Sequence, residues 1–242
     1  MVGWDELIKQ EQEAIERILG IKDGEELRDL AWNDFKKTAM VVDHNPESPF
    51  IVWPAINRQP YQVWLPVVLL QAVKLEIKPW LNELNEAVVM GVPSSGQWYG
   101  EVLKRVEVLE RDGWQVSYAR LEKEKNLVSE IGDGVWRVGV PSYVYQRKQD
   151  GSRGKEKMIL FNYEVVRGKV VVVLDDAIAE GLTLSYLGEG LKKELGARKV
   201  VVAGAMAKTM QGGKKKLAEN KFIDKVISLV DVTKEVLNDL DR

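Results

Sequence analysis

Short runs of apolar residues alternate with helical patterns through the second half of the chain. The clearest run, VVVVL at residues 170–174, has no polar interruption and ends at a turn. Such a run is typical of a parallel strand that is buried on both faces of its sheet. The patterns predict strands over residues 87–91, 115–119, 169–174, 199–205 and 225–230. They predict helices over residues 96–112, 183–195 and 211–219, and a short helix from residue 233.

The first 85 residues carry a different pattern. Apolar residues at helical spacing predict two helices between residues 4 and 39. Residues 40–62 contain four prolines and predict an irregular connector or short strands. The next apolar segment predicts only short helices, because Pro66 and Pro79 limit any longer one. These helices are expected over residues 71–77 and 80–85.

Repeated strand–helix units with buried strands predict an α/β fold, with a mostly parallel twisted sheet and helices on both of its faces. We divide the chain into an N-terminal helical region, residues 1–85, and an α/β core, residues 86–242. A long polar stretch within the core, QRKQDGSRGKEK, is expected to form a loop flanked by residues 143–146 and 158–162.

Composition narrows the possible functions. The net charge of −2 creates no basic field that would attract nucleic acid. The absence of cysteine excludes disulfides and thiolate chemistry, and a single histidine, His44, argues against a multi-histidine metal site or a Ser-His triad. No segment resembles a signal peptide or reaches the roughly 18 apolar residues of a membrane helix. We therefore expect a cytoplasmic protein without a membrane partner.

Two adjacent acids follow the central strand, and a short loop of small residues separates them from the next helix. Acids at the carboxyl end of a parallel strand lie where open α/β sheets bind ligands. The N-terminus of the following helix attracts anions through its free N–H groups and its dipole. Asp175 and Asp176 beside such a loop suit a sugar phosphate. The alternative is a pair of acids that cap a helix at an ordinary turn.

This segment resembles the diphosphate-sugar signature of type I phosphoribosyltransferases, in which two acids and two further residues precede a loop such as Ala-Thr-Gly-Gly-Thr. Here the loop is Ala179-Glu180-Gly181-Leu182-Thr183, and three of its five positions match. Glu180 and Leu182 depart from the pattern, as these positions also do in xanthine phosphoribosyltransferases and purine-operon repressors. The resemblance covers roughly residues 86–232 and is strongest to this purine branch.

The resemblance implies roles for these residues. Asp175 and Asp176 would bind the ribose hydroxyls, directly or through a hydrated Mg²⁺ ion. The loop residues Ala179, Glu180, Gly181, Leu182 and Thr183 would bind the 5-phosphate. A carboxylate at Glu180 would weaken phosphate binding unless it points outward. For Thr183 the alternative is an ordinary helix N-cap.

Two further loops match the family by order and spacing. Ser94, Ser95 and Gly96 would bind the diphosphate, although a plain strand-to-helix turn has the same composition. Arg147 and Lys148 begin the long polar loop and match an Arg-Lys pair in a catalytic loop that closes over the diphosphate. A solvated charged hairpin is the alternative for that loop.

Lys208 matches a lysine that lies near the nucleobase in the xanthine-type branch, and a strand-end surface lysine is the alternative. Taken together, the resemblance implies Mg²⁺-dependent transfer of 5-phosphoribose from 5-phosphoribosyl 1-diphosphate to a nucleobase, expected to be a purine, with release of diphosphate. It also implies a homodimer, and a base-recognising hood in residues 1–85.

Two other functions remain open from the sequence. The first is a non-catalytic regulator that binds 5-phosphoribosyl 1-diphosphate or a nucleotide, as purine-operon repressors do. The acidic N-terminal 40 residues contain no recognisable DNA-recognition helix, which disfavours DNA binding. The second is an unrelated doubly wound nucleotide-binding protein in which the acid pair is a coincidence.

Overall fold

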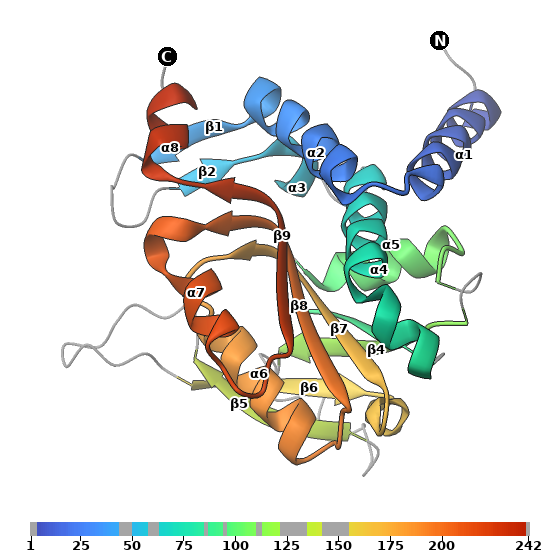
Figure 1. Ribbon diagram of the computed structural model, residues 1–242, viewed down its shortest axis with the longest axis vertical. Coiled ribbons are helices and arrows are strands. Elements are labelled where there is room, and N and C mark those ends of the chain that lie inside the picture. The colour runs from blue at the N-terminus through green and yellow to red at the C-terminus, as the bar shows by residue number, and fades with distance from the viewer. Residues whose placement is uncertain are drawn as a thin grey trace.

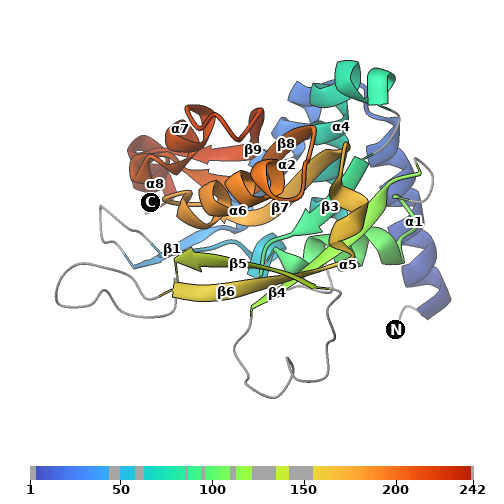
Figure 2. The same cartoon turned by 90° about the horizontal axis from the view of Figure 1, so that it is seen from below.

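A computed structural model describes residues 4–43, 50–57, 63–84, 87–93, 96–109, 113–121, 135–141 and 155–240 (Figure 1). Within these ranges the strands form a seven-stranded sheet in the order β5-β6-β4-β3-β7-β8-β9. The last five strands in this order are parallel: β4 (Gln115–Leu121), β3 (Ala87–Gly91), β7 (Val170–Ile178), β8 (Lys199–Lys208) and β9 (Lys225–Val232). The antiparallel strands β5 (Val135–Pro141) and β6 (Lys155–Phe161) extend the sheet beyond β4 (Figure 2).

Helices cover both faces of the sheet, as the sequence predicted. Figure 1 shows α4 (Trp64–Leu84) and α5 (Gln97–Arg105) on one side of the strands, and α6 (Leu182–Lys193) and α7 (Gly213–Ala218) on the other. Outside α4 lie α1 (Trp4–Gly20) and α2 (Gly24–Thr38), which pack against it. The remaining elements are β1 (Met40–Asp43), β2 (Phe50–Val52), α3 (Pro54–Asn57), α8 (Lys234–Leu240) and the 3-10 turns Tyr163–Val166 and Thr209–Gln211.

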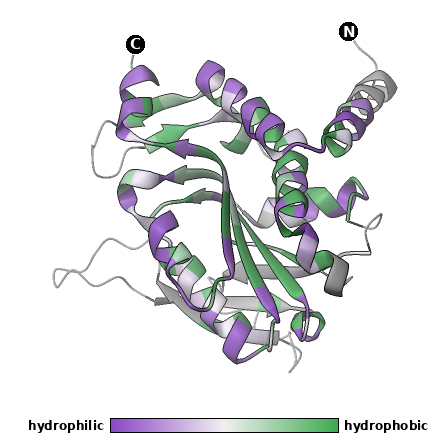
Figure 3. Ribbon diagram, in the orientation of Figure 1, coloured by the Kyte–Doolittle hydropathy of each residue, from purple (hydrophilic) through white to green (hydrophobic). Residues whose placement is uncertain are grey.

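The central strand β7 divides its side chains between two apolar cores. Val170, Val172 and Leu174 belong to the core under α4 and α5, whereas Val171 and Val173 belong to the core under α6. All five are buried, which confirms the prediction of a strand covered on both faces. Figure 3 shows β7 and β8 as the hydrophobic centre of the molecule, with hydrophilic residues on the outer helices.

The connections place a crevice at the carboxyl ends of β3 and β7. The chain leaves β3 through α5 toward β4, but it leaves β7 through α6 toward β8, on the other side. Because α5 and α6 cover opposite faces, the loops after β3 and β7 diverge. This is the topological switch point at which doubly wound sheets bind ligands.

Several predicted boundaries were wrong, for identifiable reasons. Strand β6 begins at Lys155, inside the stretch expected to form a polar loop, because residues 155–157 pair with β5. A single helix, α4, replaces the two predicted around Pro79, because its inward residues Leu70, Val73 and Ile77 are completely buried and packing outweighs the missing N–H. The helix expected to reach residue 112 ends at Arg105, and Glu107 adopts a left-handed conformation. Strand β7 continues through Asp175 and Asp176 to Ile178.

The extension of β7 has a clear cause, since its pairing with β8 continues past the acids. Asp175 lies opposite Gly204, and Ile178 lies opposite Ala207. Residues 143–146, which the sequence placed beside the polar loop, lie outside the described residues. The proposed division at residue 85 stays a prediction, although one apolar core contains residues from both sides of it. None of the described helices is long and apolar enough to cross a membrane.

One ionic contact ties the start of β9 to β8 and α6. Asp224 accepts hydrogen bonds from Lys199 Nζ at 2.9 Å and from the Val200 N–H at 2.8 Å, and it forms an ion pair with Lys192 at 2.7 Å. Burial raises the pKa of Asp224, but the bonds from Lys192, Val200 and Lys199 outweigh burial and hold its pKa below the usual value. Ionised Asp224 therefore stabilises the folded protein.

We predict that Asp224→Asn lowers the free energy of unfolding by about 1 kcal/mol at pH 7, because the carboxylate is only partly buried. A carboxyl group with a lowered folded pKa stabilises the protein above its unfolded pKa of about 3.9 and loses that contribution as the pH falls through the folded pKa. Urea unfolding at pH 7 and at about pH 2.5 should show the difference between variant and wild type disappearing in acid. An equal difference at both pH values would contradict the ionic explanation.

Candidate active site

A cavity of about 280 Å³ lies at the carboxyl ends of β3, β7 and β8. The structure brings to it most of the residues that the sequence assigned to a sugar-phosphate site. Its walls are Val92, Pro93, Asp175, Asp176, Ala177, Ala179, Gly181, Leu182, Thr183, Leu184 and Lys208. Strand β7 supplies the acids, the following loop and α6 supply the small residues, and β8 supplies the lysine.

The acid pair is held by its own backbone. The Asp176 N–H donates to Asp175 Oδ1 at 2.9 Å, and the Ala177 N–H donates to Asp176 Oδ1 at 2.8 Å. Burial of the Asp175 carboxyl, and then the adjacent charge of Asp176, raise the pKa of Asp175 well above its usual range. A carboxyl group with a raised pKa costs free energy when it ionises, and bound hydroxyl donors or a cation lower that cost.

Lys208, the last residue of β8, lines the same cavity. Burial lowers the pKa of Lys208, and the negative charge of Asp176 opposes this shift. The lysine is therefore a partly buried cation whose charge is stabilised by Asp176. Its predicted place near a nucleobase stays a prediction, and its place beside Asp176 is what the structure shows.

The loop after β7 leads directly into an uncapped helix N-terminus. Gly181 is the N-cap of α6 and has a φ of 72°, in the left-handed region that favours glycine. Gly181 has no side chain that could cap the helix, and Thr183 is the second residue of α6, so Thr183 is not the N-cap. The N–H groups of the first turn point out of the helix start, where Leu182 and Thr183 line the cavity. This arrangement can bind a phosphate.

Glu180 is the loop residue whose carboxylate was expected to weaken phosphate binding unless it points outward. Its neighbours Ala179 and Gly181 line the cavity, but Glu180 does not. Glu180, one of the two departures from the family pattern, therefore adds no further carboxylate to the cavity wall.

The start of α7 supports this loop from behind, which sequence reasoning did not predict. The Gly213 N–H donates to the Ala179 carbonyl at 3.0 Å. A Cβ atom on Gly213 would lie 2.0 Å from that carbonyl oxygen, and one on Gly181 would lie 2.9 Å from Leu217 Cγ. The Gly212-Gly213 pair before the helix was the available signal, because paired glycines often mark a close backbone contact.

On the other side of the cavity, Gly96 packs against β7. A Cβ atom on Gly96 would lie 2.7 Å from the Leu174 carbonyl oxygen and 3.0 Å from Asp175 Cα. The predicted diphosphate loop thus approaches the acid pair through its glycine. Ser94 and Ser95 lie outside the described residues, as do Arg147 and Lys148, so their roles stay predictions.

The chain matches no family model and no curated protein sequence. Its structure is similar to that of adenine phosphoribosyltransferase from Saccharomyces cerevisiae, solved with adenine and an imino-altritol bisphosphate. The two are 17% identical, with a TM-score of 0.55 over 83% of this chain and 99% of that one. The enzyme from Rhodothermus marinus is 16% identical, with a TM-score of 0.54 over 84% of this chain and 99% of that one.

A third similar structure is adenine phosphoribosyltransferase from Trypanosoma brucei, solved with AMP, pyrophosphate and ribose-5-phosphate. It is 16% identical, with a TM-score of 0.55 over 85% of this chain and 82% of that one. At such identities the similarity establishes the fold. The protein has the type I phosphoribosyltransferase-like fold that the sequence predicted.

We predict that Gly213→Ala weakens binding of a phosphorylated sugar by about tenfold, because its methyl group would push the Ala179 carbonyl and the helix start out of position. Calorimetric titration with ribose 5-phosphate measures the effect. Gly212→Ala is the control for a glycine substitution in the same segment, since no atom lies within 4 Å of a Cβ at Gly212. Its positive φ of 71° will lower stability, so binding is compared well below both unfolding temperatures. Equal binding by the two variants would contradict the supporting role of Gly213.

Proposed function

We propose that the protein is a phosphoribosyltransferase that transfers 5-phosphoribose from 5-phosphoribosyl 1-diphosphate to a purine base and releases diphosphate. One observation carries the proposal. The acid pair of β7 and the uncapped N-terminus of α6 line one cavity, at the switch point of a phosphoribosyltransferase-like sheet. This combination provides acceptors for ribose hydroxyls and donors for a phosphate at the two sides of one site.

The residues suggest how the sugar is oriented. The N–H groups at the start of α6 would hold the 5-phosphate, and Asp175 and Asp176 would accept hydrogen bonds from the 2- and 3-hydroxyls. Fixing the sugar at both ends presents C1 to the incoming ring nitrogen, and orientation of this kind lowers the barrier without proton transfer by the protein. The oxocarbenium-like centre that develops at C1 is favoured by the nearby carboxylates.

The acid pair also fits magnesium. Within the described ranges no cluster of three or more acidic, histidine or cysteine side chains could hold a metal by itself. Mg²⁺ commonly binds through one or two carboxylates together with substrate phosphates and water, which is what Asp175 and Asp176 could offer. When bound with the sugar diphosphate, the ion would supply positive charge to the departing diphosphate.

Lys208 would add a fixed positive charge to the same cavity. Because Asp176 stabilises its ammonium form, the lysine can bind an electronegative group of substrate or base while it offsets the charge of the acids. The choice of a purine rests on the similarity of the downstream sequence to the purine branch and on the adenine enzymes with similar structures.

We predict that Asp175→Asn/Asp176→Asn lowers kcat/KM by about a hundredfold or more, since the variant loses the carboxylates that bind ribose and favour the charged transition state. Calorimetry with 5-phosphoribosyl 1-diphosphate and Mg²⁺ measures binding, and diphosphate release against a panel of purines and pyrimidines measures transfer. Binding without release for any base would indicate a sensor of the sugar diphosphate. Absence of binding by the wild-type protein would reject both functions.

We predict that Glu180→Thr, which restores the common family residue, changes kcat/KM by no more than about threefold, because Glu180 is not on the cavity wall. A gain far above this would show that the Glu180 carboxylate opposes the phosphate. Steady-state assays at several sugar-diphosphate concentrations separate an effect on KM from one on kcat. Glu189→Thr, a substitution at a half-exposed position of α6 that pairs with Lys193, is the control for the loss of one negative charge.

A further inference from the structure

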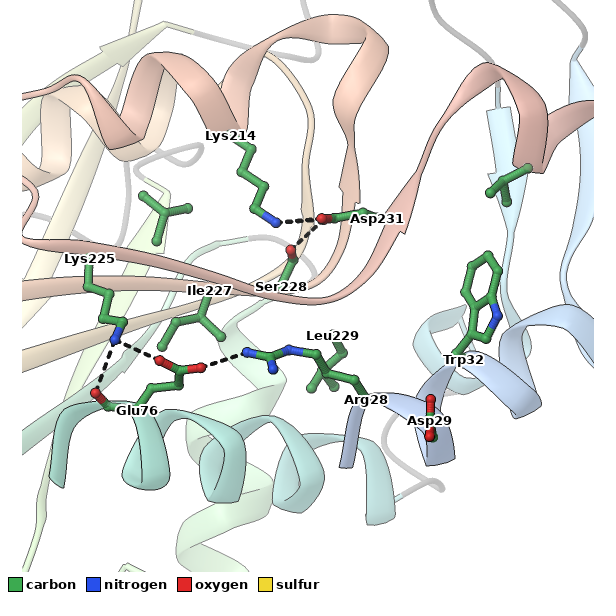
Figure 4. Close-up of a pocket in the computed structure, with 12 residues that line it drawn as sticks. Arg28, Asp29, Trp32, Glu76, Lys214, Lys225, Ile227, Ser228, Leu229 and Asp231 are labelled. Carbon is green, nitrogen blue, oxygen red and sulfur yellow. Dashed lines mark hydrogen bonds and ion pairs between the residues drawn. The ribbon is translucent and has the colours of Figure 1, made fainter. Parts of the chain in front are cut away.

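A second cavity, of about 480 Å³, lies along the outer edge of β9 and is larger than the candidate active site. Strand β9 forms its floor, α2 and α4 form one wall, and α7 forms the other (Figure 4). None of the residues that line it belongs to the sugar-phosphate site. Its volume falls within the range of small-molecule sites in proteins, about 300–1,000 Å³.

One end of this cavity carries an excess positive charge. The Glu76 carboxylate forms ion pairs with Arg28 Nη2 at 2.7 Å and with Lys225 Nζ at 2.6 Å, so two cations share one carboxylate. Hydrogen bonds from Lys225 and then Arg28 lower the pKa of Glu76, which is therefore ionised at neutral pH. The cluster has a net charge of +1. One of the five N–H groups of the Arg28 guanidinium donates to Glu76, and this bond also fixes the orientation of the planar group.

The other end is electrically balanced. Lys214 Nζ lies 2.6 Å from Asp231 Oδ2, and the buried Ser228 donates its hydroxyl to the same carboxylate. Asp29 also lines the cavity, but Figure 4 shows it well apart from the Arg28 guanidinium group. A negatively charged ligand is therefore attracted to the end at Arg28 and Lys225.

The floor offers both polar and apolar contacts. Strand β9 is the last strand of the described sheet, so alternate residues along it turn their main-chain groups away from β8 and toward the outer edge. No described strand pairs with β9 on that side. The side chains of Ile227 and Leu229 in this floor are only 4% exposed, so the floor is largely shielded from water. Polar groups in such a place favour a partner that can pair with them.

We propose that this cavity is a second ligand site, which binds a small organic carboxylate with an apolar body. The planar guanidinium group of Arg28 matches a carboxylate geometrically, and a net charge of +1 matches a monoanion. The apolar body lies over Ile227 and Leu229, with the Trp32 ring at the far end of the cavity. Main-chain N–H groups of β9 provide further donors. The site is independent of the function proposed for the acid pair.

The test uses 4-phenylbutyrate as the probe and its neutral amide, 4-phenylbutanamide, as the matched compound. Ligand-observed NMR on the full chain should detect the acid, with the amide bound at least about tenfold more weakly because it cannot form the charge-assisted contact. Arg28→Gln should weaken the acid by about tenfold or more. Arg17→Gln removes an exposed arginine of α1 outside the cavity and should leave binding unchanged.

Lys225→Gln is a second variant with the same expected direction, and circular dichroism verifies that each variant is folded. Three results would overturn the proposal: equal binding of acid and amide, binding that survives both substitutions, or no binding to the wild-type protein. Saturating 5-phosphoribosyl 1-diphosphate with Mg²⁺ should not displace the probe. Displacement would show that the probe binds in the acid-pair cavity, and this result would also overturn the proposal.

Discussion

The fold and the candidate site both depend on β7, a strand that is buried on both faces and ends in two carboxylates. Residues 170–174 alternate between two cores, and β3 and β8 pair with the strand on either side. This central position, between two paired strands and two layers of helices, buries all five apolar residues. The same placement draws Asp175 and Asp176 into the protein, where burial and mutual repulsion raise the pKa of Asp175. The strand that organises the core therefore imposes an electrostatic cost at its end, and a bound ligand can offset that cost.

Close backbone contacts, and not long side chains, position the loops around that strand end. Gly96 approaches Leu174 and Asp175 from the β3 side, and Gly213 approaches Ala179 from the α7 side. At both positions a Cβ atom would collide with main-chain atoms, which have no rotamer to change. The helix start that would bind a phosphate is thus fixed by α7 behind it, and the acid pair is fixed by its own strand. Preorganisation of this kind keeps the reorganisation cost of binding low.

Sequence patterns predicted the five parallel strands because burial on both faces leaves an uninterrupted apolar run, as in residues 170–174. They did not predict β5, and they assigned the first residues of β6 to the polar loop. They predicted the end of β7 less well, since two acids look like a turn although pairing with β8 continues to Ile178. Pro79 was read as a helix end, because the tertiary packing that holds α4 together cannot be seen locally. The acid pair and its loop could be found by resemblance. The supporting contact of Gly213 was not predicted, because it joins segments more than thirty residues apart, and the Gly212-Gly213 pair signals a close backbone contact without specifying its partner.

Carboxylates in the two cavities experience opposite environments, and this distinguishes their roles. Glu76 lies between two cations and its pKa is lowered, so its ionised form stabilises the free protein. Asp175 lies beside another acid and its pKa is raised, so its ionised form is unfavourable until something binds. A structural carboxylate holds its neighbours in place, as Glu76 holds Arg28 and Lys225. Burial in the core makes the ionised form of Asp175 unfavourable, so this carboxylate does not stabilise the fold in the way that Glu76 does. The end of β7 is therefore where a bound ligand can stabilise a carboxylate that the fold leaves in an unfavourable state. At the edge of β9, the cluster of Glu76, Arg28 and Lys225 has one positive charge in excess.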